Sequence, residues 1–466
     1  MVKSRSRLKV ERATRKLYMS KTKAKQVQSV RGMHDILPEE QKYWRYIQKK
    51  IENLLEYYGF ERISTPVLES VDLFNRSVGE TSDIVAKEIY TLKTKGGDML
   101  ALRPEGTAPA VRAYLENGMN VRPHPVKLYY IDPMFRHDEP QAGRYRQFYQ
   151  LGLETIGDAS EAVDAEMIFI AYKLLDSLGL DGYDVHINSI GDQNCRPAYI
   201  KALKDYFRNR SKKLCKNCQL RLKENVLRVL DCKEEGCKET VKEAPQMMDF
   251  LDDACRLHFK HVLEFLDEAK VPYILDPYLV RGLDYYTRTV FELIPNENAG
   301  AQSTLIAGGR YDRLIEQLGG AKTPAAGWAM GMERLILMMK EKNVHVPELG
   351  PKPKVFLVQL GEAPKRKALP LFESFRKAGI EAKSSLGRDS IKSQLRIAHR
   401  LGVRFALIFG QKEALDGTII LREMDTGVQE TILLDRIVDE VKKRLKEKPL
   451  GVPSSGKEYE EEPAKN

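Results

Sequence analysis

Long apolar runs are absent from this 466-residue sequence, whose apolar stretches are short and interrupted by charge. A helix that spans a bilayer needs roughly 20 apolar residues in succession, so we expect a soluble protein with no membrane partner. Cysteine is also scarce, with six residues in the whole chain. Because secreted disulfide frameworks are far denser in cysteine, the composition favours a reducing compartment, and we predict a cytoplasmic location.

Acidic residues are almost missing from residues 1–30, although the whole chain contains 66 of them. This arm holds ten Lys or Arg against Glu11 alone, and it therefore carries nearly all of the chain's net charge of +10. We expect a disordered arm, since such a composition cannot build a packed core. Three interpretations stay open: an RNA-contacting tail, a transit peptide, or a dispensable terminus.

The pattern after the arm changes once along the chain. Up to residue 345, strands follow one another with few helices between them, which predicts a mainly antiparallel sheet. Residues 195–270 are charged and helical in pattern, and we interpret them as an insertion. A Pro-, Gly- and Lys-rich linker at 346–353 precedes regular strand and helix alternation at 354–446, which predicts a small α/β domain. The tail at 447–466 is predicted to be disordered.

Several elements can be placed by periodicity. Trp44, Ile47, Ile51, Leu54 and Leu55 recur at helical spacing and predict a helix over 39–58. The other elements expected in the first domain are helices at 107–117, 161–179 and 327–341, and strands at 126–135, 147–156, 183–190, 286–294 and 302–308.

The stretch FRHDEPQAGRYRQFYQLGLETIG places Arg136 and Arg144 beside a strand on which Gln150 and Glu154 share one face. An arginine fork donates two hydrogen bonds to a phosphate and keeps its charge. The pattern therefore suits a site for a polyphosphate and a small polar ligand. The alternative is an exposed strand with surface ion pairs.

Two later stretches carry the same kind of chemistry. LVRGLDYYTRTVFEL contains Arg281, Tyr285 and Tyr286, and tyrosine hydroxyls beside a buried carboxylate such as Glu154 can hold an imidazole by both ring nitrogens. AAGWAMGMERLILMM contains Arg334 early in a helix. In isolation, two adjacent tyrosines usually split between core and surface, and a helical arginine usually faces solvent.

Together these three stretches closely resemble the second motif, the histidine-specific motif and the third motif of histidyl-tRNA synthetases, which are class II aminoacyl-tRNA synthetases. RGMHDILPEE, SVGETSDIV, LRPEGTAPAVR and AGGRYDRLIEQLGG match that family too, and the resemblance spans roughly residues 31–445. It implies a class II α+β catalytic domain at 31–345, a helical insertion at about 195–270, and an α/β anticodon-binding domain at 354–446. The implied enzyme is a homodimeric histidine–tRNA ligase of protein biosynthesis.

The resemblance also implies a reaction and its residues. ATP with Mg²⁺ would activate L-histidine to histidyl-adenylate and pyrophosphate, and histidine would then pass to the 3′ end of tRNA(His). Arg136 and Arg334 would grip the phosphates of ATP with Arg144 close by, and Arg281 would neutralise the α-phosphate. These positions are the implied catalytic and ATP-binding set.

The implied histidine pocket comes from four segments. The amino end of histidine would be surrounded by Glu80, Thr81, Ser82 and Gln150, while Glu154, Tyr286 and Tyr311 would read the imidazole and Tyr285 would line the pocket. Gln141 would lie near the tRNA acceptor end. Glu139 departs from the Arg that many bacterial relatives carry, and a carboxylate there repels phosphate.

Cys215, Cys218, Cys232 and Cys237 form a C-x2-C-x13-C-x4-C pattern inside the insertion. This spacing can close a tetrahedral thiolate site for a structural Zn²⁺. The alternative is four free or partly buried thiols in a reducing cell, and both interpretations stay open from the sequence.

A non-catalytic function is the main alternative to the ligase. The synthetase-like regulatory subunit of histidine biosynthesis shares the fold, but it typically has eroded motifs and no anticodon domain. Because this chain keeps Arg136, Arg281 and Arg334 and carries the extra α/β domain, the sequence favours the ligase.

Overall fold

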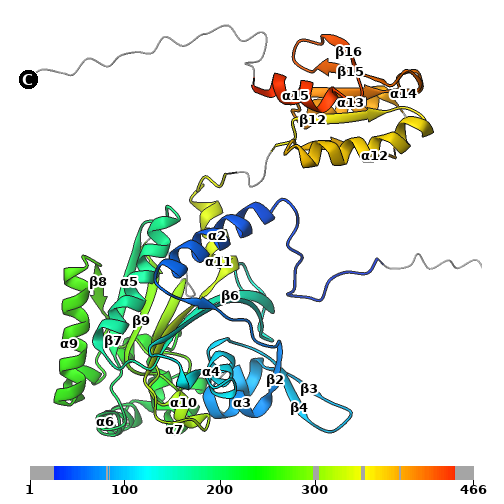
Figure 1. The fold of residues 1–466 in the computed structure, drawn as a ribbon. Helices are drawn as coiled ribbons and strands as arrows, with labels where there is room; N and C mark the ends of the chain where they lie inside the picture. Colours follow the sequence, from blue (N-terminus) through cyan, green and yellow to red (C-terminus); the bar gives the residue numbers. More distant parts are fainter. Residues whose placement is uncertain are drawn as a thin grey trace, which may run out of the picture. The chain divides into compact units, whose positions relative to one another are not determined.

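The computed structural model describes residues 26–79, 82, 84–296, 304–347, 352–387 and 390–446 (Figure 1). The chain separates into two compact units, and the boundary between them along the sequence falls between residues 347 and 348. Most of the predicted basic arm and the whole predicted tail lie outside the described residues. No described helix combines the length and the apolar character that a bilayer crossing needs.

The first unit is built on an eight-stranded sheet with the order β1-β5-β6-β11-β10-β9-β7-β8. Only the two edge pairs, β1 with β5 and β7 with β8, are parallel, which confirms the predicted mainly antiparallel sheet. The strands are β1 (Glu61–Arg62), β5 (Val126–Phe135), β6 (Gln147–Ile156), β7 (Tyr183–Ser189), β8 (Tyr273–Leu275), β9 (Thr287–Pro295), β10 (Ile306–Arg310) and β11 (Ala325–Gly331).

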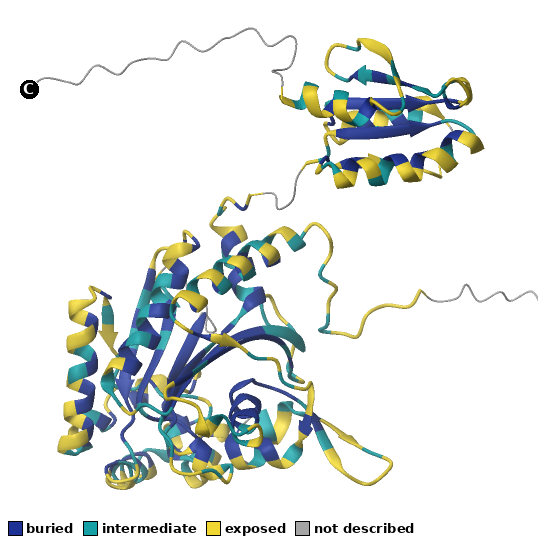
Figure 2. Ribbon diagram, in the orientation of Figure 1, coloured by how far each residue is buried: buried dark blue, intermediate teal, exposed yellow. Residues whose placement is uncertain are grey.

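One face of this sheet is packed against helices and forms the main hydrophobic core (Figure 2). The helices are α2 (Gln41–Tyr57), α5 (Glu161–Ser177), α9 (Asp253–Glu268) and α11 (Met332–Glu341). Trp44, Ile47, Ile51 and Leu55 of α2 are buried in this core as their spacing predicts, whereas Leu54 is only partly buried against it. Their removal from water is the main stabilising contribution of α2.

The opposite face of the sheet carries polar side chains. Leu151 and Leu153 of β6 point into the helical core, so the alternating residues Gln150 and Glu154 face the other way. This second face is bordered by α3 (Val71–Ser77), α4 (Thr107–Glu116), α10 (Leu314–Gln317) and a three-stranded sheet of β2 (Leu68–Ser70), β4 (Met99–Leu102) and β3 (Tyr90–Lys93).

The predicted helix at 327–341 is wrong in its first part, because residues 325–331 form strand β11 and the helix begins at Met332. β11 lies between β6 and β10 and packs tightly against β6. A Cβ on Gly327 would lie 2.1 Å from Glu154 Oε2 and 2.3 Å from the Leu153 carbonyl oxygen. Only glycine fits there. Five of the seven residues of β11 are Ala or Gly and none is β-branched, so this strand carries only a weak strand signal.

The predicted insertion is helical. It contains α6 (Arg196–Arg208), α7 (Lys216–Glu224) and α8 (Glu235–Val241), with short 3₁₀ turns between them. These helices bury a separate cluster that includes Tyr199, Leu203 and Phe207. The insertion therefore has a small core of its own.

The second unit is an α/β domain, as predicted. Its sheet has the order β13-β12-β14-β15-β16, with β13, β12 and β14 parallel and the last two strands antiparallel. The strands are β12 (Val355–Gln359), β13 (Ala382–Ser384), β14 (Phe405–Phe409), β15 (Thr418–Glu423) and β16 (Gln429–Leu433), and the helices are α12 (Glu362–Lys377), α13 (Ile391–Arg400), α14 (Gln411–Asp416) and α15 (Ile437–Lys446). The sequence pattern did not predict β16 or α14.

A buried ion cluster joins helix α5 to helix α9 and strand β10. Asp164 Oδ1 accepts a hydrogen bond from Arg310 Nε at 2.8 Å, and Asp164 Oδ2 lies 2.8 Å from His258 Nε2. All three side chains are buried. Burial opposes ionisation of Asp164, but Arg310 and His258 outweigh it and hold the pKa of this carboxyl below its usual range.

Replacing Asp164 with Ala should destabilise the first unit strongly, because the buried Arg310 guanidinium would lose one of its two carboxylate partners and keep only Asp312. We expect a loss of about 3–5 kcal/mol in the free energy of unfolding, measured by urea denaturation at neutral pH. Asp176→Ala is the matched control, since Asp176 lies on the same helix in an exposed ion pair with Lys173. The control should unfold near the wild-type midpoint; equal midpoints for both variants would contradict the assigned role of Asp164.

Candidate active site

Four arginines that are far apart in the sequence line one cavity of about 630 Å³ in the first unit. This volume lies within the range of small-molecule sites. The cavity is walled by the β5–β6 connection, by the segment before β9, by the start of α11 and by part of the insertion. The four arginines are Arg136, Arg144, Arg281 and Arg334.

Two of these arginines are held by backbone carbonyls. Arg136 follows the end of β5, and its Nε donates to the Pro104 carbonyl oxygen at 2.8 Å. Arg334 lies in the first turn of α11 and donates from Nε to Gly143 and from Nη1 to Thr304, at 3.2 and 2.8 Å. Carbonyl contacts position a guanidinium without cancelling its charge, so both groups remain available to an anion.

The other two arginines form ion pairs. Arg281 contacts Glu292, and Arg144 contacts Asp138. Arg281 Nε is buried and has no hydrogen-bond partner among the described residues. An incoming phosphate would therefore find an unused donor on Arg281 and would compete with a carboxylate for the rest of the group.

The electrostatics of the cavity favour an anion. Burial lowers the pKa of Arg136, and burial together with the charges of Arg144 and Arg136 lowers the pKa of Arg334. Guanidinium groups nevertheless stay protonated in proteins. Crowded positive charges in a poorly solvated site repel one another, and a polyphosphate relieves that repulsion.

A buried polar cluster lies beside the arginines. Glu154 is 1% exposed, and it accepts hydrogen bonds from the hydroxyls of Tyr130, at 3.1 Å, and Tyr311. Burial raises the pKa of Glu154 to about 8. Tyr285 stacks at a tilt on Tyr286, with ring centroids 4.7 Å apart. The result is a carboxyl group framed by aromatic rings, which is the environment that a planar cationic or hydrogen-bonding ring requires.

Five of the remaining predicted residues lie at the cavity or directly behind its lining. Gln150, Tyr285 and Tyr286 line the cavity together with the arginines, while Glu154 and Tyr311 lie behind its lining and reach it through the tyrosine cluster. Gln150 Oε1 is buried without a hydrogen-bond partner among the described residues.

The other predicted residues belong to the segment 80–82 and to the β5–β6 connection. Ser82 is buried, and its hydroxyl accepts from the Val85 amide at 3.1 Å; it is not among the residues that line the cavity. Gln141 is exposed in the β5–β6 connection, where its backbone bridges to Arg144. Glu80 and Thr81 lie outside the described residues.

Sequence reasoning missed several residues of the site, above all Glu105, Tyr130 and Glu292. Glu105 is buried against the start of α4, where its carboxylate accepts from the amides of Thr107 and Ala108 at 2.6 and 2.9 Å. An acidic residue just before a helix is a recognisable start signal. No comparable signal marks Tyr130, which reaches Glu154 only because β5 and β6 are adjacent.

Comparison with known proteins identifies the relationship. A profile of the family "Histidyl-tRNA synthetase" matches residues 32–335, and a profile of the family "Anticodon binding domain" matches residues 354–444. A protein of Dehalococcoides mccartyi named histidine–tRNA ligase is 49% identical over 418 residues, which cover 90% of this chain and 100% of that protein. A protein of the same name from Pelotomaculum thermopropionicum is 45% identical and covers 89% of this chain and 97% of its own length.

Solved structures agree with the sequence relatives. The crystal structure of apo histidyl-tRNA synthetase from S. aureus superposes with a TM-score of 0.73 at 38% identity, over 90% of this chain and 100% of that one. Matches at this identity over nearly the whole chain, with both domains in order, settle the relationship: the chain belongs to the histidyl-tRNA synthetase family of class II aminoacyl-tRNA synthetases.

Proposed function

We propose that the arginine-lined cavity is where this histidine–tRNA ligase makes histidyl-adenylate. A carboxylate oxygen of L-histidine forms a bond to the α-phosphorus of ATP, and the bond from that phosphorus to the bridging oxygen of pyrophosphate breaks. In a second step the 3′-terminal hydroxyl of tRNA(His) takes the histidyl group as an ester and AMP leaves. The observation that carries the proposal is the placement of four arginines on one cavity beside a buried carboxyl group.

The arginines supply what this reaction needs. Attack by a carboxylate on a phosphate brings two anions together, so positioning and charge neutralisation matter more than proton transfer. In our proposal Arg136 and Arg334 hold the triphosphate with Arg144 close by, and Arg281 neutralises the α-phosphate. Mg²⁺, bound with ATP, offsets further charge on the triphosphate.

Glu154 and its tyrosines form the proposed recognition site for the histidine side chain. The Glu154 carboxylate accepts one imidazole N–H, and the hydroxyls of Tyr286 and Tyr311 complete the polar surroundings, with Tyr285 packed beside them. Gln150, whose Oε1 is unpartnered among the described residues, is assigned to the amino group. The assignment of Glu80, Thr81 and Ser82 to that group rests on the family resemblance alone. A site built on buried polar groups rejects analogues that leave those groups unpaired.

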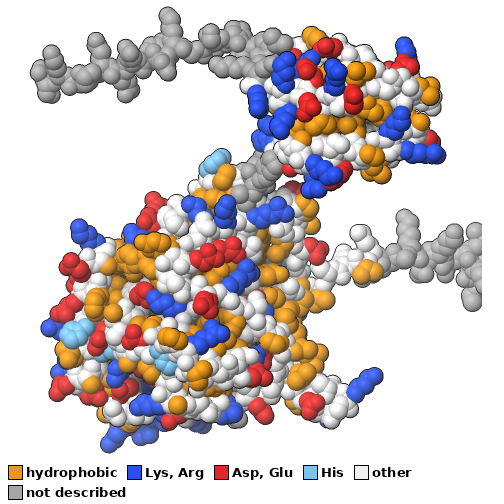
Figure 3. Space-filling view, in the orientation of Figure 1, with side chains coloured by type: hydrophobic (Ala, Val, Ile, Leu, Met, Phe, Trp, Pro, Cys, Tyr) orange, Lys and Arg blue, Asp and Glu red, His pale blue; other side chains and the backbone are white. Residues whose placement is uncertain are grey.

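The tRNA contacts are assigned to two places. Gln141 lies exposed in the β5–β6 connection, where an acceptor end can approach the cavity, and Glu139 in the same loop adds a negative charge that departs from the basic residue of many relatives. The second unit, which matches an anticodon-binding family over residues 354–444, is assigned to the anticodon. On the viewed face of both units, basic and acidic side chains are interspersed (Figure 3).

A homodimer in the cytoplasm completes the proposal. The resemblance assigns the subunit interface to the family's first motif, which is here the helix α2 and the extended segment that ends in Pro66. Directly after it, Val67 and Leu68 are exposed apolar residues at 37% and 45%. Leu92 and Met99 of the neighbouring hairpin are exposed as well. Exposed apolar side chains that cluster in one region are typical of a protein–protein interface.

The regulatory-subunit alternative is not supported. A structure described as an ATP phosphoribosyltransferase regulatory subunit/histidyl-tRNA synthetase from Bacillus halodurans shares the fold, but at 22% identity. The relatives that match this chain at more than twice that identity are named histidine–tRNA ligases.

Histidine-dependent exchange of pyrophosphate into ATP tests the proposed function. The wild-type chain should catalyse it, and Arg281→Ala should lower the rate by about 10²–10³ because the α-phosphate loses a preorganised cation. Histidine binding, followed by calorimetry, should stay close to wild type. Arg208→Ala is the control, since Arg208 is 73% exposed on α6. Folded wild-type protein without exchange activity would refute the function, and full exchange in Arg281→Ala would refute the role of Arg281.

The raised pKa of Glu154 predicts a proton linkage to histidine binding. Below about pH 8 the carboxyl of Glu154 in the free protein holds a proton, and above about pH 6.5 the imidazole of free histidine is neutral. Between these two pH values, a complex in which Glu154 and the imidazole share one proton forms without uptake or release of protons. Above pH 8 that proton must come from solvent. Compared with Glu154→Gln, the wild type should therefore take up nearly one more proton per histidine at pH 9 and none at pH 7.

Calorimetry in buffers of different ionisation enthalpy measures this uptake. The amino group of histidine contributes equally in both proteins, so the difference between them isolates residue 154. Equal proton uptake in the two proteins at pH 9 would rule out a proton shared with Glu154.

A further inference from the structure

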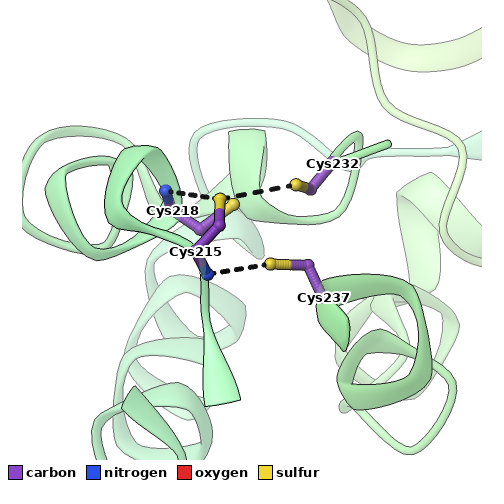
Figure 4. Close-up of side chains that lie close together, drawn as sticks. All are labelled: Cys215, Cys218, Cys232 and Cys237. Atoms are coloured by element: carbon purple, nitrogen blue, oxygen red, sulfur yellow. Dashed lines mark hydrogen bonds between the residues drawn. The ribbon is translucent and has the colours of Figure 1, made fainter. Parts of the chain in front are cut away.

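Four cysteine sulfurs converge at one point in the insertion. Cys215 is the N-cap of α7 and Cys218 lies in its first turn, Cys232 follows the 3₁₀ turn Val226–Val229, and Cys237 lies in the first turn of α8. Figure 4 shows their side chains turned toward one another. All four Sγ atoms lie within 4.8 Å of one another.

The spacing of the sulfurs fits one metal ion. Ligands about 2.3 Å from a tetrahedral centre are about 3.8 Å apart, and Cys215 Sγ lies 3.9 Å from Cys232 Sγ. This separation is far beyond the roughly 2.0 Å of a disulfide bond. Three of the four side chains are at least nine-tenths buried, which suits a closed structural site and leaves no open position for water.

The backbone is arranged to receive negative sulfur. The Cys215 amide donates to Cys237 Sγ at 3.2 Å, and the Cys218 amide donates to Cys215 Sγ at 3.4 Å (Figure 4). Both cysteine-bearing helices direct their N-terminal ends at the cluster, and helix N-termini favour negative charge. Lys216, Lys233 and Lys238 follow cysteines in the chain and add positive charge around the site.

The cluster also borders the active-site cavity. Cys232 and its neighbours Leu230, Asp231 and Lys233 line the same cavity as the arginines, as does Lys238 next to Cys237. An ion bound by the four sulfurs would tie this wall to α7.

A second connection runs to the segment that carries Arg281. Between Cys218 and Cys232, Arg228 Nη2 donates to the Gly282 carbonyl at 2.6 Å, and Asn225 donates to Asp284 Oδ1 at 3.0 Å. Hydrogen bonds therefore connect the segment between the cysteines to the segment that carries Arg281.

We propose that Cys215, Cys218, Cys232 and Cys237 bind one structural Zn²⁺, and that this ion fixes the 230–238 wall of the active-site cavity. The first half stands on the sulfur geometry alone, and the second half rests on the function proposed above. Zinc is assigned over ferrous iron because divalent zinc binds a given thiolate set more tightly.

The neighbouring pair Cys195 and Cys255 provides a matched comparison. Their Sγ atoms lie 3.7 Å apart, with Asp192 and Asp252 close by. Those carboxylates already accept from the backbone amides of Asn194 and Cys255, at 2.9 and 2.8 Å, and Arg288 lies 3.5 Å from Asp192. A cation would compete there with existing contacts, so this pair is assigned no metal.

Metal content of the untagged full-length protein, purified from zinc-supplied cells and measured by mass spectrometry, tests the first half. We expect about one zinc per chain in the wild type and in Cys195→Ser/Cys255→Ser, and less than about a tenth of that in Cys232→Ser/Cys237→Ser. Zinc retained by the last variant, zinc lost from the control pair, or stoichiometric iron in the wild type would each overturn the site.

Cobalt reconstitution of the wild-type chain covers the case in which the variant does not fold. Co²⁺ in place of zinc should show tetrahedral d–d bands and thiolate-to-cobalt charge-transfer absorption, and a spectrum without charge transfer would overturn the thiolate ligands. Neither readout depends on catalysis.

The second half has its own test. Chelation of the zinc should lower histidine-dependent exchange several-fold, and returning Zn²⁺ should restore it. Unchanged exchange in zinc-free protein would overturn the link to the cavity wall and leave the metal site standing. A holoenzyme that holds zinc but lacks exchange would instead count against the proposed function.

Discussion

Buried positive charge is the constraint on which the rest of this molecule depends. Arg136, Arg281 and Arg334 are drawn into one cavity from three separate parts of the chain, and like charges at close range in a poorly solvated site repel one another. The fold tolerates this because carbonyl oxygens hold two of the groups and Glu292 pairs with the third. In the proposed function, a triphosphate would replace these carbonyl and carboxylate partners, and its negative charge would relieve the repulsion.

The sheet provides the rigid base for these groups. β6 and β11 approach so closely that Gly327 is the only residue that fits opposite Glu154, and this register fixes the depth of the carboxyl group in the protein. β11 leads directly into α11, which carries Arg334 in its first turn. Strand register therefore sets the separation between Glu154, which we propose contacts the imidazole, and the arginines that we propose bind phosphate.

Much of this arrangement could be predicted from the sequence, and the exceptions have physical causes. The periodicity of α2 and the alternation of β6 gave the correct buried faces because each is a local pattern with one apolar side. The sequence pattern predicts helix where residues 327–331 form a strand, because the Ala and Gly residues that the close strand packing requires carry little strand signal. The partnership of Tyr130 with Glu154 depends on pairing between strands, and a single sequence does not encode register visibly.

In the charged site, too, the sequence predicts the residues, whereas their contacts depend on the fold. Arg136, Arg281 and Arg334 were singled out by motif, yet their present partners, among them Glu292 and the Thr304 carbonyl, come from segments whose proximity only the fold determines. For the four cysteines, the fold decides between interpretations that the sequence leaves open. Their spacing left two interpretations open, and the three-dimensional arrangement of four sulfurs within 4.8 Å favours one of them.

A crystal structure of the chain with a non-hydrolysable ATP analogue and histidinol measures the central claim most directly. The account predicts that the triphosphate contacts the guanidinium groups of Arg136, Arg281 and Arg334, with Arg281 released from Glu292, and that the imidazole donates a hydrogen bond to Glu154. A nucleotide bound away from these three arginines, or an imidazole that does not contact Glu154, would contradict it.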